Sequence, residues 1–253
     1  MIPKIIHYCW FGNNPLPKMA KECIDSWKKF FPEYEIIEWN ETNFDIAVND
    51  YVKEAYRCKR FAFVSDYARF WILYNYGGLY FDTDVKVIKS MDDIIERGAF
   101  MGFETPIASG IPLYVAPGLG MGCPKESPLI KDFIDIYDDL HFIGSDGSQN
   151  LITIVQLING ILLDNGLKAS TQIQRVKDFY IYPKDFFNPY DAVSDKYVVT
   201  ENTRSIHYFA ASWKTSKEKF MESIKRIFGD RGVDFIHCIY SHTFKKLKNI
   251  NIT

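Results

Sequence analysis

Residues 62–84 read AFVSDYARFWILYNYGGLYFDTD and combine a helical pattern, a pair of glycines and an acidic pair. Apolar residues recur at helical spacing up to Tyr76 and stop at Gly77-Gly78, which predicts a helix with a glycine terminus. A short apolar strand, Leu79–Phe81, is expected next, and Val85–Ile88 is strand-like as well. Strands alternating with helices are typical of an open α/β sheet.

Two carboxylates, Asp82 and Asp84, follow the predicted strand one residue apart. Residues i and i+2 of an extended segment point the same way, so both side chains are expected to face one cavity. Like charges at that separation repel unless a cation lies between them. Oxygen ligands favour Mg²⁺ or Mn²⁺, and such ions commonly accompany a diphosphate. The pair predicts a metal-dependent enzyme acting on a nucleotide diphosphate; solvated turn residues or a helix cap are the alternative.

Asp66 and Arg69 lie three residues apart on the predicted helix and therefore share one face. Because the helix ends directly at the acidic strand, these side chains can border the same pocket. In that case Asp66 meets a donor hydroxyl and Arg69 a sugar or phosphate. An ordinary intrahelical ion pair is the alternative.

A second dense cluster runs from Ser205 to Lys214. His207, at the end of a predicted strand, could complete a metal site made otherwise of oxygens. The Ser212 hydroxyl, the Trp213 indole N–H and the Lys214 charge could all meet phosphate oxygens. A lone histidine is more often an ordinary core or surface residue, so the spacing leaves both interpretations open.

The remaining chain continues the α/β pattern without repeats or a convincing linker. The segment Gly118–Gly122 is expected to be a flexible loop. Further expected elements are strands at 4–10, 34–39, 99–104 and 205–209, and helices at 17–30, 127–141 and 148–163.

Composition bounds the class of protein. The 253 residues include 47% hydrophobic and 25% charged side chains, which fits one globular domain. The net charge of −2 gives no case for nucleic-acid binding. Five scattered cysteines indicate neither a zinc site nor a disulfide framework, which fits a cytoplasmic location. The start resembles a strand and no signal peptide, and no apolar run approaches the roughly 20 residues that span a bilayer.

The end of the chain, residues 216–253, is expected to form basic amphipathic helices packed on the same domain. A solvated charged face is the simplest explanation of this pattern. Peripheral contact with the inner face of an anionic membrane is the alternative.

Three blocks together resemble glycosyltransferase family 32, whose members carry a DXD motif. They are IPKIIHYCWFG at 2–12, the central block at 62–84, and HYFAASW at 207–213. The resemblance implies a GT-A fold, here residues 1–215, with Mn²⁺ or Mg²⁺ as cofactor. It also implies retaining transfer of a hexose or N-acetylhexosamine from a UDP-sugar. The acceptor is expected to be a saccharide, with a lipid-linked oligosaccharide of surface polysaccharide synthesis suiting the basic end.

Residue by residue, the resemblance assigns roles at one donor site. Trp10 matches the aromatic residue that stacks on uracil, and His7 lies in the same block. The expected catalytic residues are Asp66, Arg69, Asp82 and Asp84; the metal ligands Asp82, Asp84 and His207; and the donor contacts His7, Trp10, Asp66, Arg69, Asp82, Ser212, Trp213 and Lys214. Many relatives have an asparagine where this chain has Gly118–Gly122, which removes one polar contact.

Two other functions remain open. Asp82 also fits the nucleophile of haloacid-dehalogenase-type phosphatases, and Gly229–Asp234 resembles their late acidic motif. The turn expected after the first motif is missing, however, and that interpretation leaves Trp10, Asp66 and Arg69 unexplained. A non-catalytic nucleotide-sugar-binding scaffold is the second alternative.

Overall fold

The computed structural model describes residues 1–107, 114–191 and 194–210. The chain divides into two compact units, Met1–Phe209 and Ala210–Thr253, and the description below concerns the first. Ser212, Trp213, Lys214 and the predicted helices at 216–253 lie outside the described residues. The predicted boundary at residue 215 stays a prediction.

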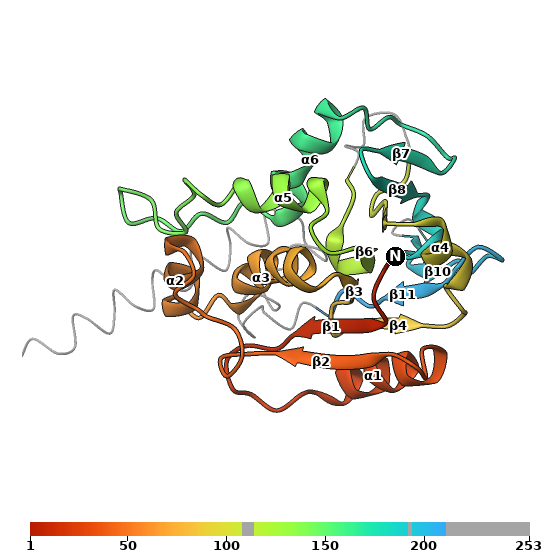
Figure 1. Ribbon diagram of the computed structural model, residues 1–253, viewed down its shortest axis with the longest axis horizontal. Coiled ribbons are helices and arrows are strands. Elements are labelled where there is room, and N and C mark those ends of the chain that lie inside the picture. The colour runs from red at the N-terminus through yellow and green to blue at the C-terminus, as the bar shows by residue number, and fades with distance from the viewer. Residues whose placement is uncertain (108–113, 192–193, 211–253) are drawn as a thin grey trace, which may run out of the picture. The chain divides into compact units, whose positions relative to one another are not determined.

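Seven strands form the central sheet: β1 (Ile5–Cys9), β2 (Glu35–Trp39), β3 (Gly78–Tyr80), β5 (Phe100–Gly102), β6 (Met121–Cys123), β7 (Gln174–Val176) and β8 (Phe179–Tyr182). Their order is β2-β1-β3-β6-β5-β8-β7 (Figure 1). β1 runs parallel to β2 and β3, and β5 runs parallel to β8. Only β6 and β7 run antiparallel to their neighbours. The mostly parallel open sheet confirms the predicted α/β architecture.

Two smaller sheets complete the strands that the structure describes. They are β4 (Val85–Val87) with β11 (Ser205–His207), and β9 (Tyr190–Asp191) with β10 (Lys196–Tyr197). The β4–β11 pair matters most for function, because it brings the end of the described chain to the segment that follows the acidic pair.

Helices cover both faces of the sheet: α1 (Lys18–Phe30), α2 (Asp50–Arg57), α3 (Phe61–Tyr76), α4 (Asp92–Arg97), α5 (Pro128–Asp135) and α6 (Ile154–Asp164). The apolar faces of α2, α3, α5 and α6 share one hydrophobic core, and those of α1 and α4 share a second. Strand β3 contributes to both. Tyr80 packs in the first core, whereas Leu79 joins Trp27 of α1 in the second. Successive side chains of β3 therefore point to opposite faces of the sheet, and both faces are buried.

The junction between α3 and β3 depends on two glycines. Gly77 ends the helix with φ of 65°, and its N–H donates to the Leu73 carbonyl at 2.8 Å. Gly78 has φ of 103°, and a Cβ there would lie 2.7 Å from the Ile5 carbonyl oxygen. Only glycine fits both positions without strain. The chain therefore turns directly from the helix into the strand, as predicted.

The segment Gly118–Gly122 is not the flexible loop that its glycines suggested. Pro117–Leu119 forms a 3-10 turn, and residues 121–122 belong to the fully buried strand β6. A Cβ on Gly122 would lie 2.6 Å from the side chains of Leu79 and Phe100. These glycines permit close packing in the sheet and not mobility.

Both predicted helices of the middle third are shorter than expected. The helix predicted at 127–141 ends at Asp135, and the one predicted at 148–163 begins at Ile154. Thr153 and Gln156 form a capping box at the second start, where side chain and backbone pair reciprocally. This local signal outweighs the apolar pattern that precedes it.

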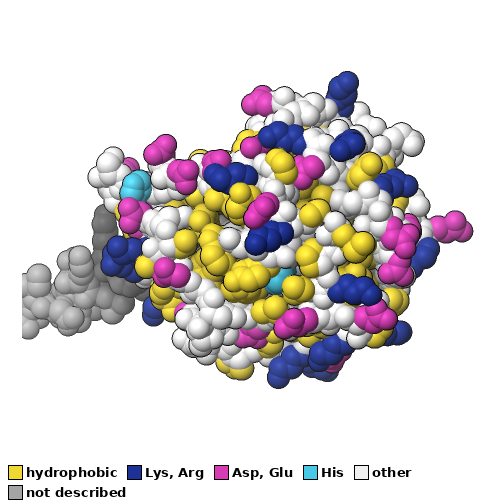
Figure 2. Space-filling model, in the orientation of Figure 1, with side chains coloured by type: hydrophobic (Ala, Val, Ile, Leu, Met, Phe, Trp, Pro, Cys, Tyr) yellow, Lys and Arg dark blue, Asp and Glu magenta, His cyan; other side chains and the backbone are white. Residues whose placement is uncertain are grey.

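Among the helices that the structure describes, none combines the length and apolarity needed to cross a bilayer. On the face shown in Figure 2, basic and acidic side chains are interspersed around apolar ones. That face therefore offers no continuous basic surface of the kind that binds nucleic acid.

Candidate active site

Asp82 and Asp84 lie in a tight turn between β3 and β4. The Val85 N–H donates to the Asp82 carbonyl at 3.0 Å and closes this turn. The Trp27 indole N–H donates to the Val85 carbonyl at 2.7 Å, which fixes the start of β4 to α1. The pair therefore sits in a turn and not in an extended strand, yet both carboxylates still face one region.

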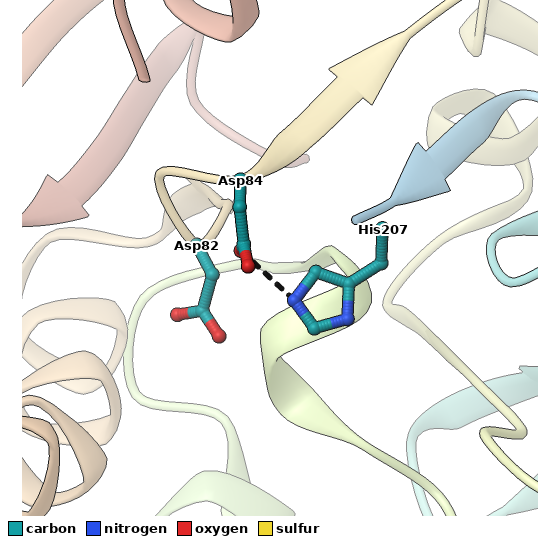
Figure 3. Close-up of side chains that lie close together, drawn as sticks. All are labelled: Asp82, Asp84 and His207. Carbon is teal, nitrogen blue, oxygen red and sulfur yellow. Dashed lines mark hydrogen bonds and ion pairs between the residues drawn. The ribbon is translucent and has the colours of Figure 1, made fainter. Parts of the chain in front are cut away.

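Strand β11 brings His207 to this turn (Figure 3). His207 Nε2 lies 2.9 Å from Asp84 Oδ1, and the Tyr208 N–H donates to the Asp84 carbonyl at 3.0 Å. One potential ligand atom from each of Asp82, Asp84 and His207 lies within 4.8 Å of the others. We call these three residues the DXD cluster. Their side chains are largely enclosed, with 12% of His207 and 17% of Asp84 exposed.

The environment of His207 is set by its acidic neighbour. Burial alone would lower its pKa, but the hydrogen bond and negative charge of Asp84 outweigh burial and raise the pKa. The other ring nitrogen, Nδ1, is buried and has no hydrogen-bond partner in the part of the chain that the structure describes. Nδ1 lies on the side of the ring away from Asp84, so Nε2 is the nitrogen directed at the acidic pair (Figure 3).

Arg69 links the DXD cluster to helix α3. Its Nη2 lies 2.9 Å from Asp66 Oδ1 and 3.2 Å from Asp82 Oδ1, and its side chain is only 6% exposed. The guanidinium also lies over the Tyr80 ring, 5.0 Å from its centroid. The intrahelical pair considered from the sequence therefore exists, and the same guanidinium also holds Asp82. A buried arginine with two carboxylate partners is a rigid source of positive charge.

Asp66 is almost as enclosed as Arg69. Burial raises the pKa of Asp66 to about 6, with the nearby Arg69 opposing the shift and Asp82 adding to it. Ionised carboxylates accept hydrogen bonds, and this one shares the Arg69 guanidinium with Asp82 of the DXD cluster.

Gly118 is a site residue that the sequence analysis missed. A Cβ at this position would lie 2.0 Å from Asp82 Oδ2 and 3.3 Å from Arg69 Nη1. Its carbonyl also accepts the Asp82 N–H at 3.3 Å. The absence of a side chain therefore makes room for the Asp82 carboxylate. Sequence offered the glycine run as a signal, but nothing in it pointed to Asp82.

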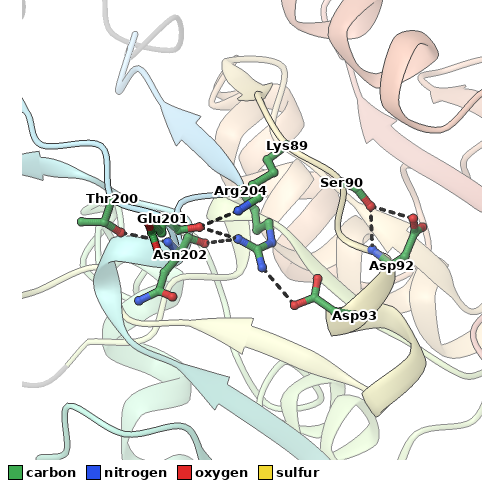
Figure 4. A network of polar contacts seen from close by, with 8 residues as sticks. All are labelled: Lys89, Ser90, Asp92, Asp93, Thr200, Glu201, Asn202 and Arg204. Atoms are coloured by element: carbon green, nitrogen blue, oxygen red, sulfur yellow. Dashed lines mark hydrogen bonds and ion pairs between the residues drawn. The ribbon is translucent and has the colours of Figure 1, made fainter.

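A polar network around Arg204 holds β11 in place (Figure 4). The guanidinium pairs with Asp93 at 2.9 Å and donates to the carbonyls of Glu201 and Asn202. The Arg204 carbonyl in turn accepts the Ile88 N–H at 2.8 Å, next to β4. This network anchors the strand from which His207 reaches Asp84.

Two predicted donor contacts differ in their placement. Trp10 follows β1 and is half-buried, and its indole N–H donates to the Asn14 carbonyl at 2.6 Å. His7 is fully buried, with Nε2 2.9 Å from the Gly77 carbonyl oxygen and Nδ1 accepting the Trp39 indole N–H at 3.0 Å. Neither ring nitrogen of His7 is therefore available to contact a nucleotide-sugar donor. We therefore correct its predicted role and assign it to the fold.

The DXD cluster fits a divalent cation. Two carboxylates and an imidazole form a mixed oxygen and nitrogen donor set, which suits Mn²⁺ and also Mg²⁺. His207 Nε2, which faces Asp84 Oδ1 at 2.9 Å, is the nitrogen that would join the two carboxylates on such an ion.

Similarity to known proteins points to the same region. Residues 17–101 match the family described as "Glycosyltransferase sugar-binding region containing DXD motif". The chain is 30% identical over 152 residues to "Inositol phosphoceramide mannosyltransferase 3" of Schizosaccharomyces pombe. It is 28% identical over 114 residues to "Mannosyl phosphorylinositol ceramide synthase CSH1" of Saccharomyces cerevisiae. These matches cover 56% and 42% of this chain but 40% and 29% of the relatives, so the chain spans less than half of their length.

Solved glycosyltransferases are among the structures similar in fold. One, involved in glycosylation of the major capsid of PBCV-1, has 12% identity and a TM-score of 0.48, covering 87% of this chain and 100% of its own. Another, the galactosyltransferase LgtC, has 14% identity and a TM-score of 0.42, covering 82% and 87%. Likenesses this distant say nothing about activity. The family match spans Asp66, Arg69 and the acidic pair, so residues 17–101 resemble the sugar-binding region of DXD-motif glycosyltransferases.

Proposed function

We propose that this protein transfers a hexose or N-acetylhexosamine from a UDP-sugar to a saccharide acceptor, with retention at the anomeric carbon. The observation that carries the proposal is the DXD cluster, with its ligand atoms within 4.8 Å of one another and Arg69 fixed beside it. Acidic ligands next to a buried guanidinium suit a metal-bound diphosphate, because both cations offset the charge of the phosphates.

Each residue of the site then has a defined task. Asp82, Asp84 and His207 would hold Mn²⁺ or Mg²⁺, which supplies positive charge to the departing diphosphate. Arg69 keeps the Asp82 carboxylate in position and adds its own charge nearby. Asp66 accepts a hydrogen bond from a hydroxyl of the donor sugar. In the transfer, the bond from the anomeric carbon to the diphosphate breaks and the bond to the acceptor oxygen forms on the same face. The acceptor proton passes to a diphosphate oxygen.

The finer parts of the proposal have separate support. Trp10, half-buried after β1, supports a stacking partner for uracil and hence a UDP-sugar. One relative named above is an inositol phosphoceramide mannosyltransferase and another a mannosyl phosphorylinositol ceramide synthase, and both names support a lipid-linked acceptor. Peripheral membrane contact through residues 216–253 at the cytoplasmic face belongs to the same proposal.

A thermal-shift screen tests this function directly. The protein is heated with UDP-glucose, UDP-galactose, UDP-N-acetylglucosamine or GDP-mannose, each with Mn²⁺ and with a chelator. GDP-mannose is included because the relatives are named mannosyltransferases. A ligand that binds only the folded state raises the melting temperature, so UDP-sugars should do so with Mn²⁺ and not with the chelator. Release of UDP is then measured for each stabilising donor.

Other outcomes would support the alternatives. Phosphate release from p-nitrophenyl phosphate without any response to nucleotide sugars would favour the phosphatase, whose late motif Gly229–Asp234 lies outside the described residues. Metal-dependent binding of a UDP-sugar with neither hydrolysis nor transfer would favour the scaffold. No response to any nucleotide sugar would overturn the proposal.

A further inference from the structure

A cavity of about 1060 Å³ opens at the carboxyl ends of β5 and β8. Glu104 follows β5 and Lys184 follows β8, and these two strands are parallel neighbours. In open α/β sheets, ligands bind outside the carboxyl ends of the strands. Strand β3 runs in the same direction as β5, because β6 lies antiparallel between them. The cavity and the DXD cluster therefore lie along the same edge of the sheet.

Contacts around Phe209 show that the cavity adjoins the DXD cluster. The Phe209 ring lines the cavity, and its centroid lies 4.2 Å from that of the His207 ring. His207 and Glu104 are also close enough for their charges to influence each other. A molecule in the cavity would therefore lie beside the DXD cluster.

Most charged groups around the cavity are already occupied by the protein. The Lys184 ammonium donates to the carbonyls of Asn188 and Tyr190. The Asp185 carboxylate accepts from Thr200, at 3.0 Å, and from the Asn202 amide. These pairs shape the wall, and they leave those two charges little capacity for a ligand.

Glu104 is different. Its backbone is fixed, since its N–H donates to the Tyr114 carbonyl and its carbonyl accepts the Asn188 amide. Its half-buried carboxylate, in contrast, makes no hydrogen bond or ion pair within residues 1–107, 114–191 and 194–210. Burial raises the pKa of this carboxyl, with His207 and Lys184 opposing the shift. A partly desolvated carboxylate without a donor is unfavourable until a ligand supplies one.

The rest of the lining combines aromatic rings with this acceptor. Phe186, Tyr190 and Phe209 all contribute to the cavity wall. A sugar ring has an apolar face that packs on aromatic side chains, and its hydroxyls donate to carboxylates. A nucleic acid or a second diphosphate is disfavoured, because an unpaired carboxylate repels phosphate.

We propose that this cavity binds the acceptor saccharide and that the Glu104 carboxylate accepts hydrogen bonds from its hydroxyl groups. The inference rests on the proposed function, since it places the acceptor beside the DXD cluster, where the donor is proposed to bind. Glu104 is thereby a specificity-determining residue for the acceptor.

Saturation-transfer NMR on the full chain tests this site without any turnover. The probes are methyl α-mannoside, methyl β-galactoside and myo-inositol. At least one should bind the wild-type protein, and Glu104→Gln should weaken that binding roughly tenfold, as expected when a hydrogen bond to a charged group is lost. Glu96→Gln, an exposed carboxylate of α4 outside the cavity, is the matched control and should bind like the wild type.

A second variant protects the test against misfolding of the first. Thr171→Trp places a large ring at the exposed rim of the cavity and should also weaken binding of the probe. Circular dichroism and thermal unfolding confirm the fold of each variant. Unchanged binding in both variants, or no binding of any probe to the wild type, would overturn the proposal.

The outcome also separates this site from the proposed function. If the protein binds a UDP-sugar with Mn²⁺ but Glu104→Gln binds the saccharide probe as tightly as the wild type, only the proposed acceptor site is wrong. If saccharides bind through Glu104 but no nucleotide sugar binds, the transferase proposal fails and the cavity remains a saccharide site.

Discussion

Polar groups of opposite character lie beside the two ends of strand β3 (Gly78–Tyr80), the His7 ring of β1 at its start and the DXD cluster beyond its end. At its start, both ring nitrogens of His7 are paired with other parts of the chain, Trp39 and Gly77. Just beyond its end, Asp82 and Asp84 crowd together with His207, with one potential ligand atom from each within 4.8 Å of the others. Polar groups paired within the core stabilise the fold, whereas carboxylates and an imidazole clustered at one point can share a bound cation.

The two histidines express this difference as opposite pKa shifts. Burial lowers the pKa of His7 to about 4, and its bond to the Gly77 carbonyl opposes this only partly. His207 is buried as well, but the Asp84 carboxylate raises its pKa. Burial is common to both, so the neighbour decides the sign: a carbonyl and an indole in one case, an anion in the other.

The largest expected effect comes from Asp84→Ala, in the turn that follows β3. Removing this ligand should lower Mn²⁺-dependent transfer by about a thousandfold, because the diphosphate charge loses its main stabilisation. The melting temperature should stay near that of the wild type, since the Asp84 carbonyl still accepts the Tyr208 N–H. UDP release and Mn²⁺ titration measure both properties. The exposed Asp139→Ala is the control, and full activity of Asp84→Ala would contradict the assignment.

The stability of the protein should depend on pH through His7, whose ring contacts Gly77 just before the start of β3. Its pKa is 6.5 in the unfolded chain and about 4 in the fold, so between these values only the unfolded chain binds the proton. The contribution of His7 to stability is therefore complete above pH 6.5 and is lost as the pH falls toward 4. At about 1.4 kcal/mol per unit, the loss reaches roughly 3 kcal/mol.

Urea unfolding of the wild type and His7→Gln across this range isolates the effect. The shift of Asp66, whose pKa is raised to about 6, is common to both proteins and cancels in their difference. Mn²⁺ binding should be retained by His7→Gln. Parallel stability curves for the two proteins would contradict the structural role of His7.

Gly118→Ala adds a methyl group where the structure leaves no room. The new Cβ would lie 2.0 Å from Asp82 Oδ2, so the carboxylate or the turn must move. We expect a loss of about 2 kcal/mol in stability and roughly tenfold weaker Mn²⁺ binding. Gly160→Ala is the matched control, because it lies inside α6 with nothing within 4 Å and should gain about 0.5–1 kcal/mol. Equal behaviour of the two variants would show that Gly118 does not shape the site.

The smallest expected effect is that of Trp39→Phe. It removes the indole N–H that His7 Nδ1 accepts, at a cost of about 1–2 kcal/mol in unfolding free energy. Trp71→Phe changes the same ring type in the same aromatic cluster, and no hydrogen bond is recorded for its indole among the described residues. Mn²⁺ binding should be unchanged in both. A weaker Mn²⁺ site in Trp39→Phe would mean that the two ends of β3 are coupled.

Prediction from sequence succeeded where the relevant contacts are close along the chain. Helix α3, the two glycines and the acidic pair lie within residues 61–84, although the pair occupies a turn and not the extended segment that was predicted. Gly118 was missed because its role depends on Asp82, and Glu104 was missed because it lines a cavity formed by β9 and the segments that follow β5 and β8. His7 was misassigned for the same reason, since Trp39 lies on another strand.

Local sequence was enough to predict the helix, the Gly77-Gly78 turn, the buried strand and the acidic pair. Apolar spacing and backbone freedom are local properties, so neighbouring residues suffice to express them. Which polar groups pair with one another, and which gather at a ligand site, depends on contacts between segments far apart in the chain. His207 lies 123 residues beyond Asp84 along the chain, and only the pairing of β11 with β4 brings the two together. Hydrogen bonds and charge interactions act over a few ångströms of space, whatever the separation along the chain.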